Sequence, residues 1–316
     1  MREIGGYIEL EHYNSTLLHD KALGLNCARN ALAYIIEAKK IKKIAMPFFM
    51  CDSCNNVFSD YHVAVRKYCI DERFFPVLEK KNDEEWTYIV NFYGQFDNGR
   101  LQELRERYTN IIVDNTQSYF QMPLQNTDTL YSCRKYFGVA DGAFLYTNEK
   151  IDRELEQDQS YSRMGFLLGR FERNANEFYD EYVNNNKFIQ TEPIKRMSKL
   201  TNNILKSIDY KKVGNIRKLN FEKLHNTFGE INRLELSVPY GAFMYPLYIE
   251  NGKEVRRKLQ ENRIYVPLLW PNVLRECARD TLEYQLAENI LPLPIDQRYN
   301  MSDMQYMEEI IKKCIN

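Results

Sequence analysis

The sequence predicts an α/β fold: a large domain with a mainly parallel, seven-stranded-type sheet flanked by helices, and a smaller C-terminal α+β domain. Short apolar runs such as Ile111–Val113 alternate with charged, amphipathic stretches such as Gly99–Tyr108. This order of strand and helix is typical of a parallel sheet covered on both faces. The composition then shifts after Thr147, so we place the large domain at residues 1–190 and the small one at 191–316.

Composition and charge exclude several classes of protein. Apolar residues make up 44% and charged residues 28%, which is ordinary for a globular chain. The net charge of −1, with scattered lysines and arginines, argues against a nucleic-acid surface. No apolar run approaches the roughly 18 residues needed to span a membrane. Acids interrupt the first residues where a signal peptide is apolar, and seven cysteines lack a disulfide framework, so we expect a cytoplasmic protein.

The elements of the large domain follow in a regular order. A helix over 31–38 comes after the turn LNCARN, and a buried strand over 44–47 ends at a proline. Two β-rich runs, 61–70 and 86–92, precede the helix 99–108 and the strand that ends at Asp114. The stretch DTLYS (128–132) predicts another strand, and the turn at Asp141-Gly142 leads into the next.

The second half of the chain is less regular. Residues 150–185 have helical composition with an aromatic face, and the polar stretch 184–193 is the best candidate linker. Beyond it we expect helices at 218–228 and 253–260, strands at 233–238, 242–249 and 263–266, and a closing helix from Ser302. There are no internal repeats or low-complexity tracts.

Three sets of residues carry possible chemistry. An acid at a strand end, Asp114, and a lysine before a glycine turn, Lys135, suit a cofactor with a ring nitrogen and an aldehyde, although each taken alone is better explained as a solvated side chain. The turn LNCARN lies at a helix N-terminus, which suits a phosphate, or simply an Asn26 cap. Cys51 and Cys54 lack the further ligands of a zinc site and are better read as buried thiols.

The stretch VDNTQS resembles the D-x-x-Q/H segment of the DegT/DnrJ/EryC1/StrS sugar aminotransferases, which are pyridoxal-phosphate enzymes of fold type I. Lys135 is followed by Asp141-Gly142 at the spacing of that family. Ser132 lies closer to Lys135 than the family's serine does, and Ala143 replaces a second glycine. The chain thus resembles a short, divergent member.

The resemblance implies a pyridoxal 5'-phosphate site. Lys135 would carry the cofactor and move the proton, Asp114 would hold the pyridine nitrogen, and Gln117 would bind the phenolic oxygen. The phosphate would be held by the backbone of Cys27, Ala28 and Arg29 and by the Ser132 hydroxyl. The family's stacking ring falls on Cys51, and Phe49 is the nearest aromatic side chain.

The same resemblance implies an aminotransferase that passes an amino group from glutamate to a nucleotide-linked keto-sugar, in surface-polysaccharide or deoxyamino-sugar synthesis. Arg134 and Arg298 are candidates for a substrate anion, although Arg134 is equally explained as a surface arginine. Asn174 is a candidate for the phosphate of a neighbouring subunit in a homodimer, or lies in a solvated turn. Two alternatives stay open: the same fold as a binding or regulatory protein without transaminase activity, and a different pyridoxal-phosphate reaction.

Overall fold

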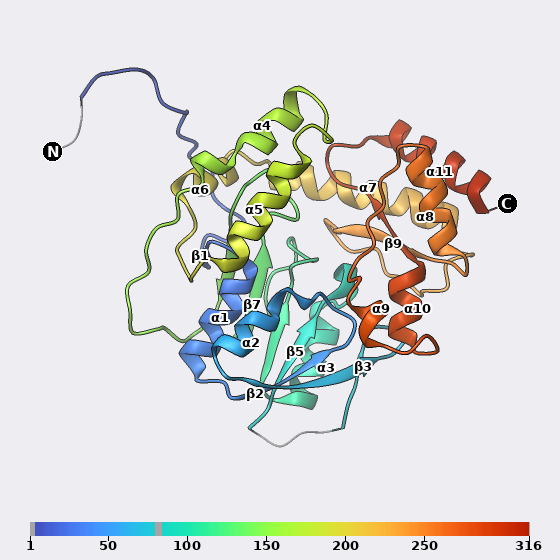
Figure 1. The fold of residues 1–316 in the computed structure, drawn as a ribbon, viewed down its shortest axis with the longest axis horizontal. Coiled ribbons are helices and arrows are strands. Elements are labelled where there is room, and N and C mark those ends of the chain that lie inside the picture. Colours follow the sequence, from blue (N-terminus) through green and yellow to red (C-terminus); the bar gives the residue numbers. More distant parts are fainter. Residues whose placement is uncertain (1–3, 80–83, 316) are drawn as a thin grey trace.

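The computed structural model describes residues 4–79 and 84–315, and within them the chain is built around one mixed sheet of eight strands (Figure 1). The strands lie in the order β1-β8-β7-β6-β5-β2-β3-β4. Their bounds are β1 Leu23–Leu25, β2 Lys43–Pro47, β3 Ala64–Ile70, β4 Pro76–Val77, β5 Trp86–Val90, β6 Ile111–Asp114, β7 Asp128–Ser132 and β8 Ala143–Tyr146.

The centre of this sheet is parallel. Strand β6 pairs in parallel with β5 on one side and β7 on the other, and β2 joins β5 and β3 in the same direction. Within the described sheet, the strands that run against the central ones are β8, which lies between β7 and β1, and β4 at the opposite margin. All four residues of β6 are buried, as expected for a strand covered on both faces. The carboxyl ends of β2, β5, β6 and β7 therefore meet at one edge.

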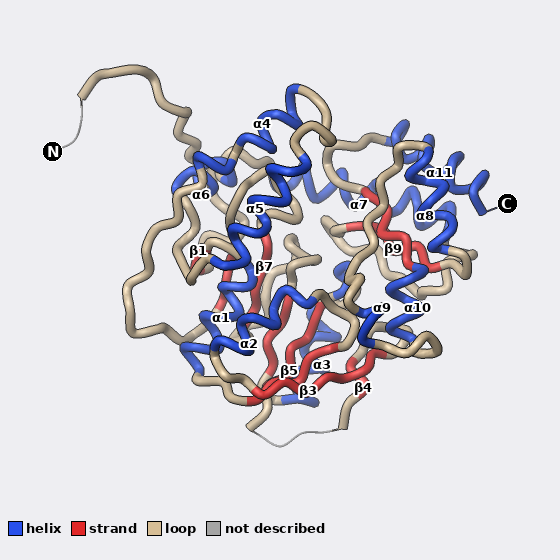
Figure 2. Tube along the Cα trace, viewed as in Figure 1, coloured by secondary structure: helices blue, strands red, loops and turns tan. Residues whose placement is uncertain are grey.

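Helices pack against the sheet, and further helices lie beside it (Figure 2). Helix α1 packs against β7 and β8, and its residues 30–36 are all buried. The helices of the first two thirds are α1 Ala28–Lys39, α2 Asn55–Asp60, α3 Asn98–Tyr108, α4 Gly165–Glu172, α5 Tyr179–Thr191 and α6 Lys199–Leu205. No helix within the described ranges is both long and apolar enough to cross a membrane.

The C-terminal elements gather around a second apolar core beside the sheet, in yellow, orange and red in Figure 1. Strands β9 Met244–Tyr248 and β10 Ile290–Pro294 pair antiparallel. The surrounding helices are α7 Tyr210–Phe228, α8 Gly252–Glu261, α9 Val273–Glu276, α10 Leu282–Asn289 and α11 Met301–Ile315. This core draws its buried residues from 221–314, whereas Ile194 and Met197 pack against the sheet cores. A boundary at residue 190 remains a prediction.

The predicted parallel α/β sheet and the smaller C-terminal unit are confirmed, but several elements differ. Residues 184–191 continue helix α5 instead of forming a linker, because Asn185 is buried and donates to Ala140 O at 2.9 Å. Residues 233–238 form no strand, since the Ser237 N–H bonds the Gln95 side chain at 2.8 Å. Residues 263–266 are also irregular, and Arg263 has a φ of 59°.

Candidate active site

A small pocket of about 140 Å³ lies at the carboxyl edge of the central strands. This is where open α/β sheets bind ligands. Residues at or just past the ends of β2, β5, β6 and β7 meet there with the N-terminus of α1. The small pocket is lined by Cys27, Ala28, Arg29, Met50, Cys51, Ser53, Cys54, Tyr88, Val90, Asp114, Thr116, Gln117, Leu130, Ser132, Arg134, Lys135, Ile189 and Trp270.

Asp114 is the buried carboxylate of this pocket, with 8% of its surface exposed. Its Oδ2 accepts from the Tyr88 hydroxyl and its Oδ1 from the Thr116 N–H, both at 2.8 Å. Burial, reinforced by Asp114, raises the pKa of Tyr88 well above its usual value, so this hydroxyl stays protonated and donates. Across the described ranges no cation lies within 4 Å of Asp114. A buried carboxylate without a cation suits a ligand that brings a protonated nitrogen.

Gln117 and Lys135 present nitrogen donors to the same pocket. Gln117 is 2% exposed, and its Oε1 accepts from the Tyr93 N–H at 2.8 Å, which leaves its Nε2 as the free donor. Lys135 donates from Nζ to Thr116 Oγ1 at 2.9 Å, and Thr116 N–H in turn bonds Asp114. The lysine amine and the carboxylate are thus linked through one intervening threonine, and Lys135 remains open to solvent.

Two arginines lie beside the first turn of α1. Arg29 and Arg134 both line the small pocket, and the like charge of Arg29 is among the causes, after burial, that lower the pKa of Arg134. Arg29 Nη1 donates to Ile189 O at 3.1 Å and Arg134 Nη2 to Asn186 Oδ1, but both Nε atoms are buried without a partner. No carboxylate of the described chain pairs with either guanidinium. Two arginines beside a helix N-terminus suit a phosphate.

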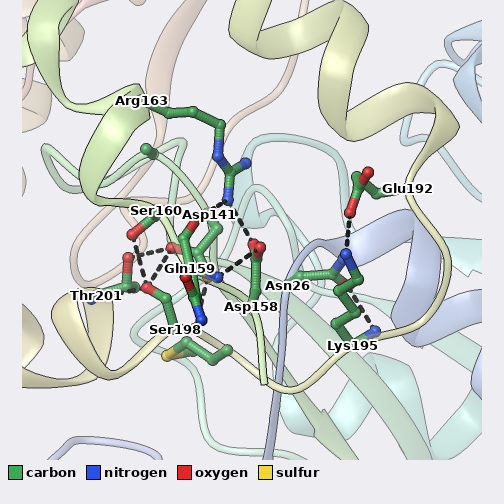
Figure 3. A network of polar contacts seen from close by, with 12 residues as sticks. Asn26, Asp141, Asp158, Gln159, Ser160, Arg163, Glu192, Lys195, Ser198 and Thr201 are labelled. Atoms are coloured by element: carbon green, nitrogen blue, oxygen red, sulfur yellow. Dashed lines mark hydrogen bonds and ion pairs between the residues drawn. The ribbon is translucent and has the colours of Figure 1, made fainter. Parts of the chain in front are cut away.

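The turn that carries Arg134 and Lys135 is fixed from its far end by Asp141 (Figure 3). Asp141 is fully buried and accepts from Ser198 N at 2.8 Å, from Ser198 Oγ at 2.7 Å and from Thr201 Oγ1. Gly142 follows with a φ of 118°, a conformation that side chains disfavour. Its carbonyl accepts from the Cys133 N–H at 3.1 Å, which closes the turn.

The small pocket adjoins a large cavity of about 840 Å³ through shared lining residues, Arg134 and Lys135. The large cavity is walled by α4, α5 and the segment after β10, and its cationic members are Arg134, Lys135, Arg170, Arg217 and Arg298. Asp296 is the one acid among its lining residues. Arg217 is 1% exposed and bonds the neutral oxygens of Gln297, Ala242, Phe243 and Tyr136.

Most of the site residues expected from the sequence come together in the small pocket: Cys27, Ala28, Arg29, Asp114, Gln117, Ser132, Arg134 and Lys135. Three do not. Phe49 is 1% exposed and packed behind the pocket, with its ring centroid 4.5 Å from that of Trp270. Asn174 lies in an exposed turn, where it bonds Glu177. Arg298 lines the large cavity, where a two-bond ion pair with Asp296 neutralises it.

Sequence reasoning missed Tyr88, Thr116, Arg217 and Trp270. Thr116 lies two residues after Asp114, inside the stretch VDNTQS, so the motif itself could have indicated it. Tyr88 lies on β5, where four successive residues are buried, so no alternation of polar and apolar residues indicates which side chains face the pocket. Trp270 and Arg217 come from the C-terminal half, and their arrival at these cavities depends on how that half packs against the sheet.

No protein-family model matches the sequence, and no curated protein matches it. Solved structures do match. A DegT/DnrJ/EryC1/StrS aminotransferase from Brucella abortus has a TM-score of 0.64 at 14% identity, covering 92% of this chain and 85% of that one. Helicobacter pylori PseC, an aminotransferase of pseudoaminic acid biosynthesis, has a TM-score of 0.63 at 13% identity, covering 93% and 86%. The putative sugar aminotransferase Spr1654 from Streptococcus pneumoniae, in its PLP-form, has a TM-score of 0.61 at 12% identity, covering 93% and 88%.

The chain therefore has the α/β fold of the fold type I pyridoxal-phosphate aminotransferases. Within that class its structural matches extend over nine tenths of the chain to sugar aminotransferases of the DegT/DnrJ/EryC1/StrS type, as the motifs around Asp114 and Lys135 predicted. At these identities the likeness defines the fold alone.

Proposed function

We propose that the protein binds pyridoxal 5'-phosphate in the small pocket and acts as an aminotransferase, passing an amino group from glutamate to a nucleotide-linked keto-sugar. The observation that carries this proposal is the meeting, in one pocket, of a buried carboxylate, a lysine amine and an arginine pair. The first suits a ring nitrogen, the second an aldehyde and the third a phosphate. Among the described residues, no cation pairs with the carboxylate and no carboxylate pairs with the arginines.

The residues fit this group in size as well as in charge. An apolar cavity of about 150 Å³ in another protein binds benzene, so the small pocket of about 140 Å³ accommodates a six-membered ring. Asp114 would accept from the ring nitrogen and Gln117 Nε2 would donate to the phenolic oxygen. Arg29, Arg134, the Ser132 hydroxyl and the α1 backbone would hold the phosphate.

When bound, the cofactor supplies an electron sink for the carbon that carries the amino group. Lys135 Nζ, freed by the incoming amine, would remove the proton from that carbon and return it to the other side of the transfer. Thr116 Oγ1, at 2.9 Å, orients the lysine amine for this task. Asp114, whose two oxygens accept from the Tyr88 hydroxyl and the Thr116 N–H, would stabilise the positive charge on the ring nitrogen.

Two departures from the family pattern have structural roles in this chain. Asn91, where relatives often carry histidine, is fully buried and donates to Phe96 O, Asn115 Oδ1 and Gln121 Oε1. Ala143 is buried at the start of β8 and pairs with Leu25 and Ser132. Neither Asn91 nor Ala143 is among the lining residues of the small pocket, so neither change argues against activity.

The large cavity supports a bulky, anionic substrate. Its volume of about 840 Å³ lies within the range for sites that bind sizeable ligands. Arg134, Arg170 and Arg217 have no carboxylate partner within the described chain, and Arg134 and Lys135 belong to both cavities. A diphosphate bound beside these arginines would place an attached sugar near Lys135 Nζ.

We also propose a homodimer in the cytoplasm. The outer faces of α4 and α5 expose large apolar side chains: Phe171 at 92%, Leu168 at 63% and Tyr179 at 61%. These residues also line the large cavity, so a second copy seated there would close its outer wall. All seven cysteines are free thiols, which supports a reducing compartment.

The first experiment is a spectrum. The purified protein, incubated with pyridoxal phosphate, should gain a visible absorption band that borohydride abolishes, and peptide mapping should find the reduced cofactor on Lys135. Lys135→Ala should lose the covalent label, while Lys253→Ala, which removes a surface lysine paired with Glu288, should keep it. Label on another lysine would refute the assignment, and no label at all would refute the cofactor.

The second experiment is a half-reaction. Enzyme loaded with the amine form of the cofactor should regain the visible band with a nucleotide-linked keto-sugar and with 2-oxoglutarate. A response to small 2-oxo acids alone would move the function to amino-acid metabolism. No response to any ketone, despite bound cofactor, would favour a binding protein or another reaction of the same cofactor.

A further inference from the structure

The small pocket contains an aromatic side chain that the sequence did not suggest, Trp270. Among its lining residues only Tyr88 and Trp270 carry six-membered aromatic rings. Tyr88 is committed through its hydroxyl to Asp114 Oδ2 at 2.8 Å. Cys51, at the place where relatives supply a stacking ring, lines the pocket with a thiol, and Phe49 lies behind it. Trp270 is thus the aromatic side chain of this pocket that is not hydrogen-bonded to Asp114.

Trp270 is held in place from two directions. Its indole packs edge-on against Phe49, with centroids 4.5 Å apart, and against Phe92 at 5.6 Å. The loop that bears it is tied to the segment that follows β2, because the buried Asn272 donates from Nδ2 to Met50 O at 3.0 Å. Met50 itself lines the small pocket. These contacts fix a residue of the C-terminal half against the sheet edge.

The backbone at Trp270 is unusual. Its φ is 60°, in the left-handed region that large side chains rarely occupy. The Val273 N–H donates to Trp270 O at 3.0 Å, so the conformation belongs to a closed turn. Strained backbone persists where surrounding contacts over-determine it, and such residues collect at ligand sites. A core-filling role alone needs no left-handed tryptophan.

We propose that Trp270 supplies the aromatic face against which the cofactor ring packs, in place of the residue after β2 that serves in relatives. The inference rests on the proposed function, since it concerns the same pocket. It assigns cofactor affinity to a loop of the C-terminal half. Trp270 is a binding residue in this proposal and takes no part in proton transfer.

The test is the binding of pyridoxamine phosphate, which lacks the aldehyde and so reports affinity without the covalent link to lysine. Calorimetry would compare the wild-type protein with Trp270→Ala, Trp270→Phe and Trp86→Ala. Trp86, the only other tryptophan, begins β5 and lies about 13 Å along the strand from Val90 at the pocket. It is the matched control for loss of an indole.

We expect Trp270→Ala to weaken binding about tenfold, the scale of one aromatic contact. Trp270→Phe should stay within about threefold of wild type, because a ring is retained, and Trp86→Ala should be unchanged. Wild-type affinity in Trp270→Ala would overturn the inference, as would Trp270→Phe binding as weakly as Trp270→Ala. Failure of the wild-type protein itself to bind would instead overturn the proposed function.

A second measurement covers the case in which Trp270→Ala does not fold. In Trp86→Phe the only indole is Trp270, and in Trp270→Phe it is Trp86. Titration with pyridoxamine phosphate should quench tryptophan emission more strongly in Trp86→Phe than in Trp270→Phe, because contact quenches more than distance does. Equal quenching, or the reverse order, would show that Trp270 does not touch the bound ring.

Discussion

Replacing Asp141 with asparagine tests whether its hydrogen bonds hold the turn that carries Lys135. Asp141 is fully buried, and its two oxygens accept from one backbone N–H and two hydroxyls (Figure 3). The amide of asparagine keeps one acceptor oxygen and loses the charge, so at least one charge-assisted hydrogen bond is lost. Such a bond contributes about 1.5–3 kcal/mol. We therefore expect Asp141→Asn to lower the free energy of unfolding by about 1.5–3 kcal/mol.

Urea denaturation, read as a shift in midpoint at constant slope, measures this loss. Asp152→Asn makes the same chemical change on an exposed aspartate and should stay within about 0.5 kcal/mol of wild type. If Asp141→Asn also changed the unfolding free energy by less than that, the buried carboxylate would not be what fixes the turn, and the account of how Lys135 is positioned would be wrong.

Four further outcomes are expected. Gly142→Ala should cost about 1–3 kcal/mol of unfolding free energy in urea, because a Cβ at a φ of 118° would lie 2.9 Å from Thr201 Cγ2. Burial lowers the pKa of His19 from 6.5 to about 4, so the unfolded chain binds the extra proton between these values. Neutral His19 therefore contributes about 3 kcal/mol to the free energy of unfolding above pH 6.5, and this contribution is lost as the pH falls toward 4. In His19→Gln, the free energy of unfolding measured in urea should change less between pH 6.5 and pH 4 than in the wild type. Arg134→Gln should weaken pyridoxamine phosphate binding by tenfold or more, about 1.5–3 kcal/mol, without affecting phosphate-free pyridoxamine, and Arg163→Gln, paired with Asp158, should change neither. Light scattering should show a dimer at micromolar concentration and a monomer for Phe171→Asp; a wild-type monomer would contradict the dimer.

Much of the fold follows from local pattern. The run Ile111–Val113 predicted a doubly covered strand, and the structure pairs it in parallel on both sides. Asp114, Gln117 and Lys135 are near one another in sequence, so a motif links them. The failures are of another kind. Asn184–Asn186 look like a linker by composition, yet the buried Asn185 amide bonds Ala140 O, a contact that only tertiary packing creates.

The stacking position shows the same limit. The sequence offered Phe49 because it is the nearest ring to the expected place. In the structure Phe49 is packed in the apolar core, and Trp270, more than two hundred residues further along the chain, lines the small pocket instead. Trp270 has a left-handed backbone conformation and is followed by a proline, so it belongs to no periodic pattern of apolar residues. Neither the position of its side chain at the pocket nor its backbone conformation could therefore be predicted from such a pattern.

The tie between the first turn of α1 and the segment after α5 has a consequence for how the chain folds during synthesis. Asn26 and Asn30 donate from Nδ2 to Pro193 O at 3.0 and 2.8 Å, and the Asn26 N–H donates to Lys195 O at 3.0 Å. These partners are separated by more than 160 residues, so loop closure across them is slow and late. A nascent chain released only as far as β8 would have every strand of the sheet but an unanchored helix start. The first turn of α1 would be anchored only after residues 193–195 have left the ribosome. Until then the incomplete sheet would be open to aggregation unless chaperones bind it or synthesis is fast.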